Sequence, residues 1–336
     1  INPMDVDLAN YIDGRATSSP HIIIKDGDSL NAPFSPEKGK TKKVSIGIPR
    51  HEAFINKKYR VPFMKAFLYT TVSTQFGCPF SCSYCSASRI PVVYRPYEEV
   101  IKELIYIDRL GIHELFFSDP SFGFPKDNAR HLLQWMVKEK FRFSWSCYCN
   151  PQLVDENTLK LMKQAGCHTV IIGIEDDDFA MLGAKFERKM TKDYLASFLN
   201  NCRRHKIRVC GDFIIGLNDR EGAVTRMVEF AIKCRLDFAS FNIYVPLMGS
   251  VERQRLIERG LVDSSSIGYD TFGTTGKEEE RLLSLRNRAV RSFYMRPSYL
   301  FKRFVEVTNF AEFIIQWTEM IGLIKGCFAK RKVRGN

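Results

Sequence analysis

Three cysteines lie close together in the chain, immediately after a strand-like run. Cys78, Cys82 and Cys85 have the spacing C-x3-C-x2-C within the segment QFGCPFSCSYCS, residues 75–86. Three thiolates at this spacing can bind three irons of a cubane [4Fe–4S] cluster, which normally has four cysteine ligands. With three ligands, the fourth iron stays open to a small molecule. Zinc would require a fourth Cys or His, and none lies nearby in the sequence. The spacing therefore favours the cluster over zinc or three unligated thiols.

The cysteine loop belongs to a regular alternation of strand-like and helix-like segments. Strands are predicted at 68–74, 114–118, 143–147, 168–175, 208–217 and 238–245, and helices between them at 96–110, 125–140, 155–165, 191–205 and 221–234. This alternation predicts an α/β fold with a parallel sheet and right-handed crossovers. Six units predict a partial (βα)6 TIM-like barrel, because eight units would need a longer chain. In such a barrel the chemistry lies at the C-terminal ends of the strands, and the cysteine loop follows the first strand.

The chain has 336 residues, of which 45% are hydrophobic, enough for one large domain with appendages. Residues 1–62 are polar, with Asp-Gly turn signals that suit a small hairpin, and are expected to be a linker or the remnant of an upstream domain. Residues 63–250 are expected to form the barrel, and residues 251–336 a helical C-terminal region. The chain begins with Ile1 and shows no signal peptide, which indicates a processed product, a trimmed chain or a fragment.

The cysteine loop resembles the signature of the radical S-adenosylmethionine (SAM) superfamily, and further motifs extend the resemblance over residues 67–300. The motifs are similar to those of the cobalamin-associated class, which includes the anaerobic magnesium-protoporphyrin ester cyclase and the class B methylases. In this superfamily the open iron binds the amino and carboxylate groups of SAM. One electron then cleaves a carbon–sulfur bond and gives a 5′-deoxyadenosyl radical. The resemblance implies a [4Fe–4S] cluster and SAM, with cobalamin held by an upstream domain.

The resemblance also implies roles for residues outside the cysteines. Tyr84, the aromatic residue before the third cysteine, would lie against the adenine of SAM. Glu175, which ends the fourth strand in Gly-Ile-Glu, would accept hydrogen bonds from the ribose hydroxyls. Gly211 and Gly216 belong to the fifth-strand motif GDFIIGL, whose backbone packs along the adenine. Asp119, after the second strand, would either hold the SAM amino group or cap the approach to a helix.

Seven further cysteines are scattered along the chain, and most are expected to be small core residues. Cys147 and Cys149 lie on one face of a predicted strand, where core packing is favoured over a second cluster. Asn150, which follows that strand, is a weaker candidate for a SAM contact. Ten cysteines in a long chain argue for a reducing compartment, and so for a cytoplasmic protein rather than a secreted disulfide framework.

Two segments depart from the family pattern. Three aspartates at 176–178 replace the usual small residues after the fourth strand, and Asn-Asp-Arg-Glu at 218–221 replaces the usual Pro-Gly-Glu after the fifth. These departures keep open a non-catalytic iron–sulfur scaffold that has lost SAM turnover. A tRNA methylthiotransferase is the other alternative. That group usually adds a C-terminal RNA-binding barrel of short strands, whereas this C-terminus has a helical pattern.

The motifs together favour an enzyme that reductively cleaves SAM at the cluster. The radical would serve methylation, or cyclisation and rearrangement, of an unactivated carbon in a small-molecule or lipid- or porphyrin-like substrate. The expected partners are SAM, that substrate, and an electron donor such as ferredoxin or flavodoxin.

The net charge of +12 is unevenly placed, because residues 281–336 contain twelve Lys and Arg against three Glu. Within this tail, residues 310–324 form an amphipathic helical pattern, and a basic run follows at 330–334. The tail is expected to cap the barrel with a solvated face, to dock on an anionic membrane surface, or to contact an acidic substrate or RNA. It does not favour nucleic acid, because no aromatic stacking platform accompanies the charge.

Overall fold

The computed structural model describes residues 24–26, 29–31, 41–54, 63–218, 220–263, 277–307 and 310–328. Most of the predicted linker and the basic run at 330–334 lie outside the described residues. Within the linker, β1 (Ile24–Asp26) and β2 (Ser29–Asn31) pair antiparallel, as the Asp-Gly turn signal predicts. The domain boundaries at residues 62 and 250 stay a prediction.

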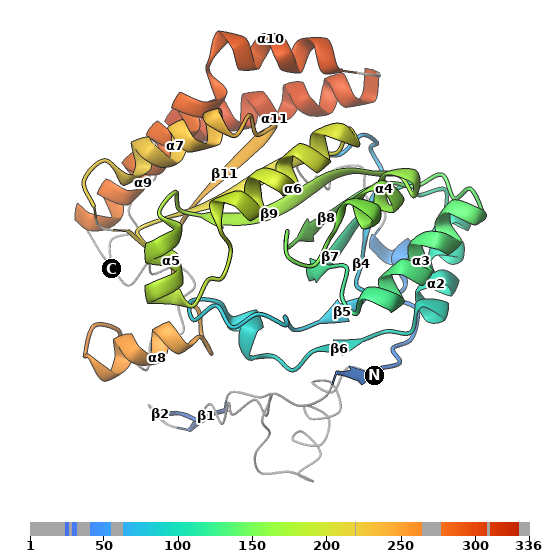
Figure 1. Ribbon diagram of the computed structural model, residues 1–336, viewed down its shortest axis with the longest axis horizontal. Helices are drawn as coiled ribbons and strands as arrows, with labels where there is room; N and C mark the ends of the chain where they lie inside the picture. Colours follow the sequence, from blue (N-terminus) through green and yellow to red (C-terminus); the bar gives the residue numbers. More distant parts are fainter. Residues whose placement is uncertain are drawn as a thin grey trace.

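Six parallel strands form one sheet in the order β11-β10-β9-β8-β7-β4 (Figure 1). Each strand of this sheet pairs with the strands of the same sheet that precede and follow it in the sequence. The strands are β4 (Tyr69–Val72), β7 (Glu114–Phe122), β8 (Ser144–Cys149), β9 (Cys167–Glu175), β10 (Arg208–Ile215) and β11 (Phe238–Ile243). Parallel pairing in sequence order, with a helical crossover between most neighbours, is the connectivity of a TIM-like barrel. The predicted α/β class and the six-stranded partial barrel are confirmed.

Helices cover the outer side of the sheet. The predicted crossover helices are α2 (Tyr97–Arg109), α3 (Lys126–Lys138), α4 (Glu156–Gln164), α6 (Lys192–Arg204) and α7 (Ala223–Lys233). Asp155 caps α4 by accepting a hydrogen bond from the Thr158 N–H, and Thr191 caps α6 in the same way, as predicted. The helix α5 (Phe179–Phe186), which follows β9, is not predicted by the sequence pattern.

In the described part of the chain, four helices follow the barrel: α8 (Val251–Glu258), α9 (Lys277–Tyr294), α10 (Pro297–Glu306) and α11 (Phe310–Phe328). The edge strand β11 is covered by α9. The Tyr294 hydroxyl accepts from the Ala239 N–H (3.0 Å) and donates to the Ala239 carbonyl (2.8 Å), and Arg286 Nε donates to the Phe241 carbonyl (3.2 Å). These bonds occupy backbone groups that an open sheet edge leaves unpaired. Among the described helices, none is both long and apolar enough to cross a membrane.

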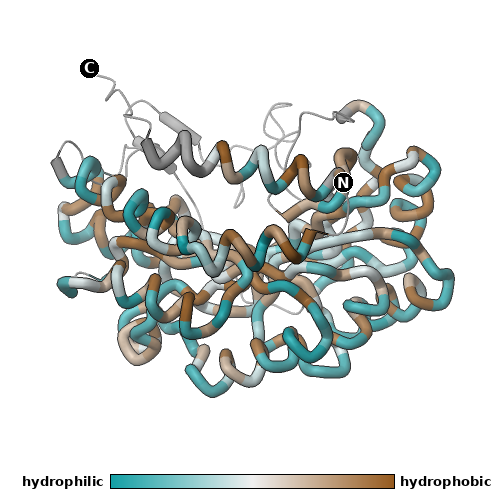
Figure 2. Tube along the Cα trace, turned by 90° about the horizontal axis from the view of Figure 1, so that it is seen from above, coloured by the Kyte–Doolittle hydropathy of each residue, from teal (hydrophilic) through white to brown (hydrophobic). Residues whose placement is uncertain are grey.

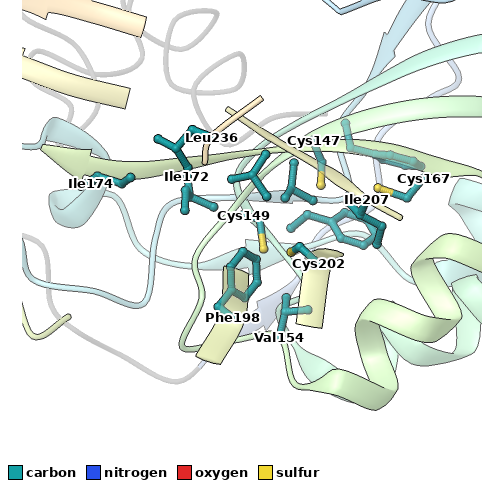
Figure 3. Close-up of a cluster of buried hydrophobic side chains, with 14 of the residues drawn as sticks. Cys147, Cys149, Val154, Cys167, Ile172, Ile174, Phe198, Cys202, Ile207 and Leu236 are labelled. Carbon is teal, nitrogen blue, oxygen red and sulfur yellow. The ribbon is translucent and has the colours of Figure 1, made fainter. Parts of the chain in front are cut away.

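The main hydrophobic core lies between the sheet and its covering helices. Four cysteines, Cys147, Cys149, Cys167 and Cys202, are buried there among aliphatic and aromatic side chains (Figure 3). Burial raises the pKa of Cys147 well above its ordinary value, so the thiol stays neutral. The expectation that Cys147 and Cys149 pack in the core is confirmed.

A small sheet of β3 (Lys42–Lys43), β6 (Val93–Tyr94) and β5 (Gln75–Phe76) lies beside the barrel, with short 3-10 helices η1 (His51–Phe54) and η2 (Ser86–Arg89). A buried polar network holds this region to the barrel. His51 Nε2 lies 2.8 Å from Glu103 Oε1, and His51 Nδ1 lies 2.6 Å from the Thr70 hydroxyl. Arg95 pairs with Glu103 (2.6 Å) and donates to the Ser73 carbonyl (2.8 Å).

Candidate functional site

The cysteine loop follows β5 and folds back on itself. The Cys78 N–H donates to the carbonyl of Ala87, and the Cys85 N–H donates to that of Cys82, both at 3.1 Å. The Ser88 hydroxyl lies within hydrogen-bond distance of the Cys82 and Cys85 carbonyls, at 3.0 and 2.6 Å. These bonds hold the three cysteines in one compact turn after the first barrel strand.

Gly77 is required by this turn. Its φ is +73°, in the left-handed region that favours glycine. A Cβ at this position would lie 2.5 Å from the Ile90 carbonyl oxygen and 2.6 Å from that of Pro91. The backbone therefore approaches too closely for any other residue.

The three thiols are free and lie in the same turn of the chain. Burial, followed by the neighbouring thiols Cys85 and Cys82, raises the pKa of Cys78 to about 11. The Cys78 thiol is thus close enough to the other two to sense their charge. Within the described ranges no three His, Cys, Asp or Glu side chains could hold a single metal ion. A cubane binds each thiolate through a different iron and does not need them to converge on one point.

Tyr84 and Glu175 are in direct contact, although 91 residues separate them in the chain. The Tyr84 hydroxyl donates to Glu175 Oε1 at 2.9 Å, and both side chains are buried. The Tyr84 ring packs edge-on against Phe186, with ring centroids 5.7 Å apart. Burial raises the pKa of Glu175, while Arg188 and the Tyr84 hydrogen bond oppose that rise. Two residues assigned separately to SAM therefore form one buried group.

Arg188 joins this group to the cysteine loop. Its Nη1 donates to Cys82 Sγ at 3.5 Å, and its Nη2 donates to the Gly173 carbonyl and lies 3.8 Å from Glu175 Oε1. The buried Nε has no hydrogen-bond partner in the described part of the chain. No sequence motif points to Arg188, because it lies in an irregular segment after α5.

A cavity of about 230 Å³ opens beside the loop. It is lined by Pro79, Phe80, Ser81, Cys82, Gln152, Glu187, Arg188 and Lys189. Arg188 and Lys189 place two cationic side chains at this cavity, and Cys82 forms part of its wall. An anionic group bound there would lie next to the cysteine loop.

The end of β9 turns the Glu175 carboxylate back over Gly173. Glu175 has a φ of +70°, which non-glycine residues rarely adopt, and the register between β9 and β10 shifts here. A Cβ on Gly173 would lie 2.2 Å from Glu175 Oε1. The Gly-Ile-Glu motif therefore has a physical basis: Gly173 provides the space that the carboxylate occupies.

The two departures from the family pattern contact each other. Asn218 Nδ2 donates to Asp176 Oδ1 at 3.3 Å, and Arg220 Nη1 pairs with Asp178 Oδ2 at 2.6 Å. Asp178 also caps α5 by accepting from the Met181 N–H at 2.9 Å. The acidic segment after β9 is thus matched by the polar segment after β10, and it starts the unpredicted helix.

Asp119 binds the backbone that leads into the cysteine loop. It is fully buried, and its carboxylate accepts from the Thr74 N–H (2.6 Å), the Gln75 N–H (3.1 Å) and the Thr74 hydroxyl (2.5 Å). Burial raises its pKa to about 6. These bonds go to the approach to the cysteine loop, so the alternative of a helix cap is not observed. A contact between Asp119 and the SAM amino group stays a prediction.

Three further candidates have packing or turn roles in the structure. A Cβ on Gly211 would lie 2.6 Å from Leu236 Cδ1, so this glycine allows close packing in the main hydrophobic core. Gly216 forms the turn that follows β10, with a φ of +99°. Asn150 accepts from the Gln152 N–H at 2.9 Å and forms a turn after β8. Their contacts with SAM stay predictions.

Polar residues on β8, β10 and β11 lie on the inner side of the barrel, and no sequence signal assigned them to the site. Asp212 is opposite Ser240 in the sheet, and Asn242 Nδ2 donates to the Ser240 hydroxyl at 3.1 Å. Tyr148 is 40% exposed. Burial, followed by the charge of Glu175, raises the pKa of Asp212 to about 7. Burial also raises the pKa of Tyr148, to which Asp212 contributes.

Residues 72–231 match the family model described as Radical SAM superfamily. The chain contains a radical SAM domain. The matched range includes the cysteine loop, Glu175, Arg188 and Asp212. The radical SAM resemblance of the sequence is confirmed.

Several relatives of this chain are named methyltransferases. The chain is 30% identical over 279 residues to an uncharacterized methyltransferase of Pyrococcus horikoshii. The aligned residues cover 79% of this chain and 59% of the relative. It is 25% identical over 190 residues to bacteriochlorophyllide d C-12(1)-methyltransferase of Chlorobaculum tepidum, covering 54% of this chain and 41% of the relative. The chain thus spans less than two thirds of the length of these relatives.

A solved structure shares the fold. The radical S-adenosylmethionine methyltransferase TsrM from Kitasatospora setae, with cobalamin and a [4Fe–4S] cluster bound, superposes with a TM-score of 0.60 at 18% identity. The match covers 76% of this chain and 54% of TsrM. The radical SAM domain therefore adopts the same barrel fold as TsrM.

Proposed function

We propose that this chain is the catalytic core of a radical SAM methyltransferase. The observation that carries the proposal is the buried 2.9 Å contact between Tyr84 and Glu175, next to three free thiols. It brings the cluster loop and a carboxylate for the ribose into one site. Because the matching relatives are methyltransferases, methyl transfer is favoured over cyclisation or rearrangement.

Cys78, Cys82 and Cys85 would hold the [4Fe–4S] cluster through three of its irons. When bound, the cluster supplies one electron to the SAM sulfonium and an open iron for its amino and carboxylate groups. Glu175 would accept hydrogen bonds from the ribose hydroxyls. The Tyr84 hydroxyl fixes the orientation of that carboxylate, and the Tyr84 ring would lie against the adenine.

Arg188 would orient the methionine end of SAM. It lines the cavity beside Cys82, and its buried Nε has an unused hydrogen for an anionic ligand. A guanidinium binds a carboxylate through two parallel hydrogen bonds, which fixes the direction of the ligand as well as its position. Lys189 adds a second positive charge at the same wall.

The methyl acceptor would lie on the inner side of the barrel, against Asp212 and Tyr148. Burial raises the pKa of Asp212 to about 7, so both its protonated and its ionised forms are accessible near neutral pH, and it can accept from a substrate N–H or donate to a ring nitrogen. The Tyr148 ring packs edge-on against Phe116 at 5.3 Å and supplies an aromatic wall. This surface fits a planar heterocycle with a ring N–H or a free ring nitrogen.

Cobalamin would carry the methyl group, as its presence in the TsrM structure supports. It would be bound by a domain other than the barrel, and the coding sequence upstream of Ile1 is the place to look for it. An electron donor such as ferredoxin or flavodoxin and a cytoplasmic location complete the proposal. RNA methylthiolation is not favoured, because the described C-terminal residues form helices rather than a strand barrel.

The proposal is tested by SAM binding to the reconstituted protein. Glu175→Gln should weaken SAM binding about tenfold, because a charged acceptor of hydrogen bonds is worth roughly 1.5–3 kcal/mol. Tyr84→Phe should have a smaller effect in the same direction, since it removes only the bond that orients Glu175. Equilibrium dialysis with labelled SAM measures both variants.

The matched control is Glu114→Gln, which changes another buried carboxylate at the opposite end of the barrel. It should bind SAM as the parent protein does. Unchanged SAM affinity in Glu175→Gln, or an equal loss in Glu114→Gln, would contradict the assignment of the site.

A further inference from the structure

The last two helices turn large apolar side chains towards solvent. The exposed fraction is 72% for Phe301, 73% for Phe304, 78% for Phe310 and 53% for Trp317. The full set, here called the outer face, consists of Leu300, Phe301, Phe304, Val305, Phe310, Phe313, Trp317 and Ile321. Figure 2 looks down on this side of the molecule and shows brown, apolar residues along the outermost helices.

The polar side of α11 faces the protein instead. Glu312 is 1% exposed and pairs with Arg208 Nη1 at 3.0 Å, and Gln316 Nε2 donates to Glu312 Oε1 at 3.1 Å. A surface helix normally packs its apolar side against the core and turns its charged side to water. On this helix the amphipathic pattern is inverted, although Ile315 is also buried.

The inversion places buried charge against the barrel. Turning α11 so that its aromatic side faced the barrel would leave Arg208 without Glu312, and breaking a buried pair costs about 3–5 kcal/mol. Burial of Phe313 and Trp317 would return a similar amount, roughly 1.5–3 kcal/mol for each side chain. An apolar partner outside the barrel would bury these side chains and keep the Arg208–Glu312 pair as well.

The charge of the region selects among possible occupants. Residues 281–336 contain twelve Lys and Arg against three Glu, and Lys325 and the basic run at 330–334 follow the outer face directly in the sequence. A second copy of the chain would bring a like-charged surface against it, which is repulsive. Exposed Phe and Trp side chains next to clustered Lys and Arg suit the interface of an anionic bilayer.

We infer that α10 and α11 bind an anionic phospholipid surface, with the outer face at the headgroup level and the basic residues paired with lipid phosphates. Arg208, which pairs with Glu312 of α11, lies at the start of β10, whereas the cysteine loop follows the other end of the strands. Membrane contact would thus leave the SAM site and the mouth of the barrel uncovered. The inference does not depend on the proposed enzyme activity.

The full chain should cosediment with vesicles of 70% phosphatidylcholine and 30% phosphatidylglycerol, and much less with vesicles of pure phosphatidylcholine. Raising NaCl to about 0.5 M should release most of it, because salt screens the electrostatic part. The double variant Phe301→Ser, Phe304→Ser should lose binding by about tenfold or more, because it removes apolar contact area. Tyr194→Ser, which changes a 51% exposed aromatic residue on α6, is the matched control.

Trp317 provides a readout that does not depend on the stability of the variants. Of the three tryptophans, Trp145 is fully buried and Trp317 is half exposed. Brominated phosphatidylcholine in the anionic vesicles should quench Trp317 fluorescence, and Trp317→Phe should abolish that quenching while still cosedimenting. No cosedimentation of the parent chain, or quenching that survives in Trp317→Phe, overturns the inference. A dimer that the double variant dissociates, with no vesicle binding, would assign the outer face to a second copy instead.

Discussion

The two ends of the barrel each bury a carboxylate beside an arginine, yet their surroundings differ. At the C-terminal end, Glu175 lies 3.8 Å from Arg188, next to a free thiol and a cavity of about 230 Å³. At the N-terminal end, Arg208 pairs with Glu312 at 3.0 Å, and α11 covers the pair. A buried ion pair therefore does not mark an active site by itself. Access to a cavity and to a reactive group distinguishes the two ends.

The N-terminal end is a structural polar network. His168 Nε2 lies 2.9 Å from Glu114 Oε1, and His168 Nδ1 lies 2.7 Å from the Thr169 hydroxyl and 3.2 Å from Arg208 Nη2. Burial lowers the pKa of His168 well below its ordinary value and raises that of Glu114 to about 8. Both groups are thus mainly neutral at pH 7. Their partners belong to the sheet itself, so the network fixes the base of the barrel.

The largest expected effect separates two groups of thiols. Changing Cys78, Cys82 and Cys85 together to Ala should abolish the iron–sulfur absorbance and all SAM cleavage, because no ligand of the cluster remains. Changing Cys147 and Cys149 to Ala should leave the iron content unchanged, since both pack in the main hydrophobic core. Iron and sulfide analysis after anaerobic reconstitution measures both. A cluster retained by the triple variant would refute the ligand assignment.

The next effect tests the covered end of the barrel. Glu312→Gln should lower the free energy of unfolding by about 3 kcal/mol, because it leaves Arg208 buried without its charge partner. Urea denaturation of the cluster-free protein measures it. Glu156→Gln is the control, because its pair with Arg204 is exposed and should contribute less than about 1 kcal/mol. Equal losses in the two variants would show that burial of the Arg208–Glu312 pair does not increase its contribution to the free energy of unfolding.

Two glycines give a smaller, paired contrast. Gly173→Ala should displace the Glu175 carboxylate from Tyr84 and weaken SAM binding about tenfold, roughly 1.4 kcal/mol, with little change in stability. Gly211→Ala should instead lower the free energy of unfolding by about 1–3 kcal/mol, because the added methyl overlaps Leu236 and Ile174 in the core. Dialysis with SAM and urea denaturation separate the outcomes. Loss of stability without loss of SAM affinity in Gly173→Ala would contradict the role given to this glycine.

The last contrast is a pH dependence at the N-terminal end. Because the pKa of Glu114 is raised to about 8, the folded state holds a proton that the unfolded state releases near pH 4.5. The contribution of Glu114 to the free energy of unfolding should therefore fall as pH rises through about 8. The net fall should appear above about pH 6.5, because below that pH the unfolded state also binds a proton on His168 that the buried His168 does not bind. Glu114→Gln should flatten this fall when urea denaturation is compared at pH 6 and pH 9. An identical slope in the variant would show that Glu114 does not titrate in this window.

Much of the fold could be predicted from periodicity and caps. The six strands and the helices between them follow from apolar patterns, and Asp155 and Thr191 cap the helices that they were expected to cap. The orientation of α11 could not be predicted, because it depends on Arg208, 104 residues earlier in the chain. Helix α5 was missed, since its start depends on Asp178 and on a loop 42 residues later.

The candidate site could be predicted only where a motif has fixed spacing. Cys78, Cys82, Cys85, Tyr84 and Glu175 all lie in such motifs, and the structure brings Tyr84 and Glu175 together. Arg188 lies in an irregular segment, and only the fold shows that it reaches both Cys82 and Glu175. Asp119 shows the opposite case, because its place after a strand suggested a ligand contact while its carboxylate binds the loop backbone.

The production of 5′-deoxyadenosine tests the central claim most directly. The protein would be reconstituted anaerobically with iron and sulfide, reduced with dithionite and incubated with SAM, and the product measured by mass spectrometry. The parent chain should form 5′-deoxyadenosine, and the variant with Cys78, Cys82 and Cys85 changed to Ala should form none. A fully loaded cluster that yields no 5′-deoxyadenosine would contradict the enzyme proposal and favour a non-catalytic iron–sulfur scaffold.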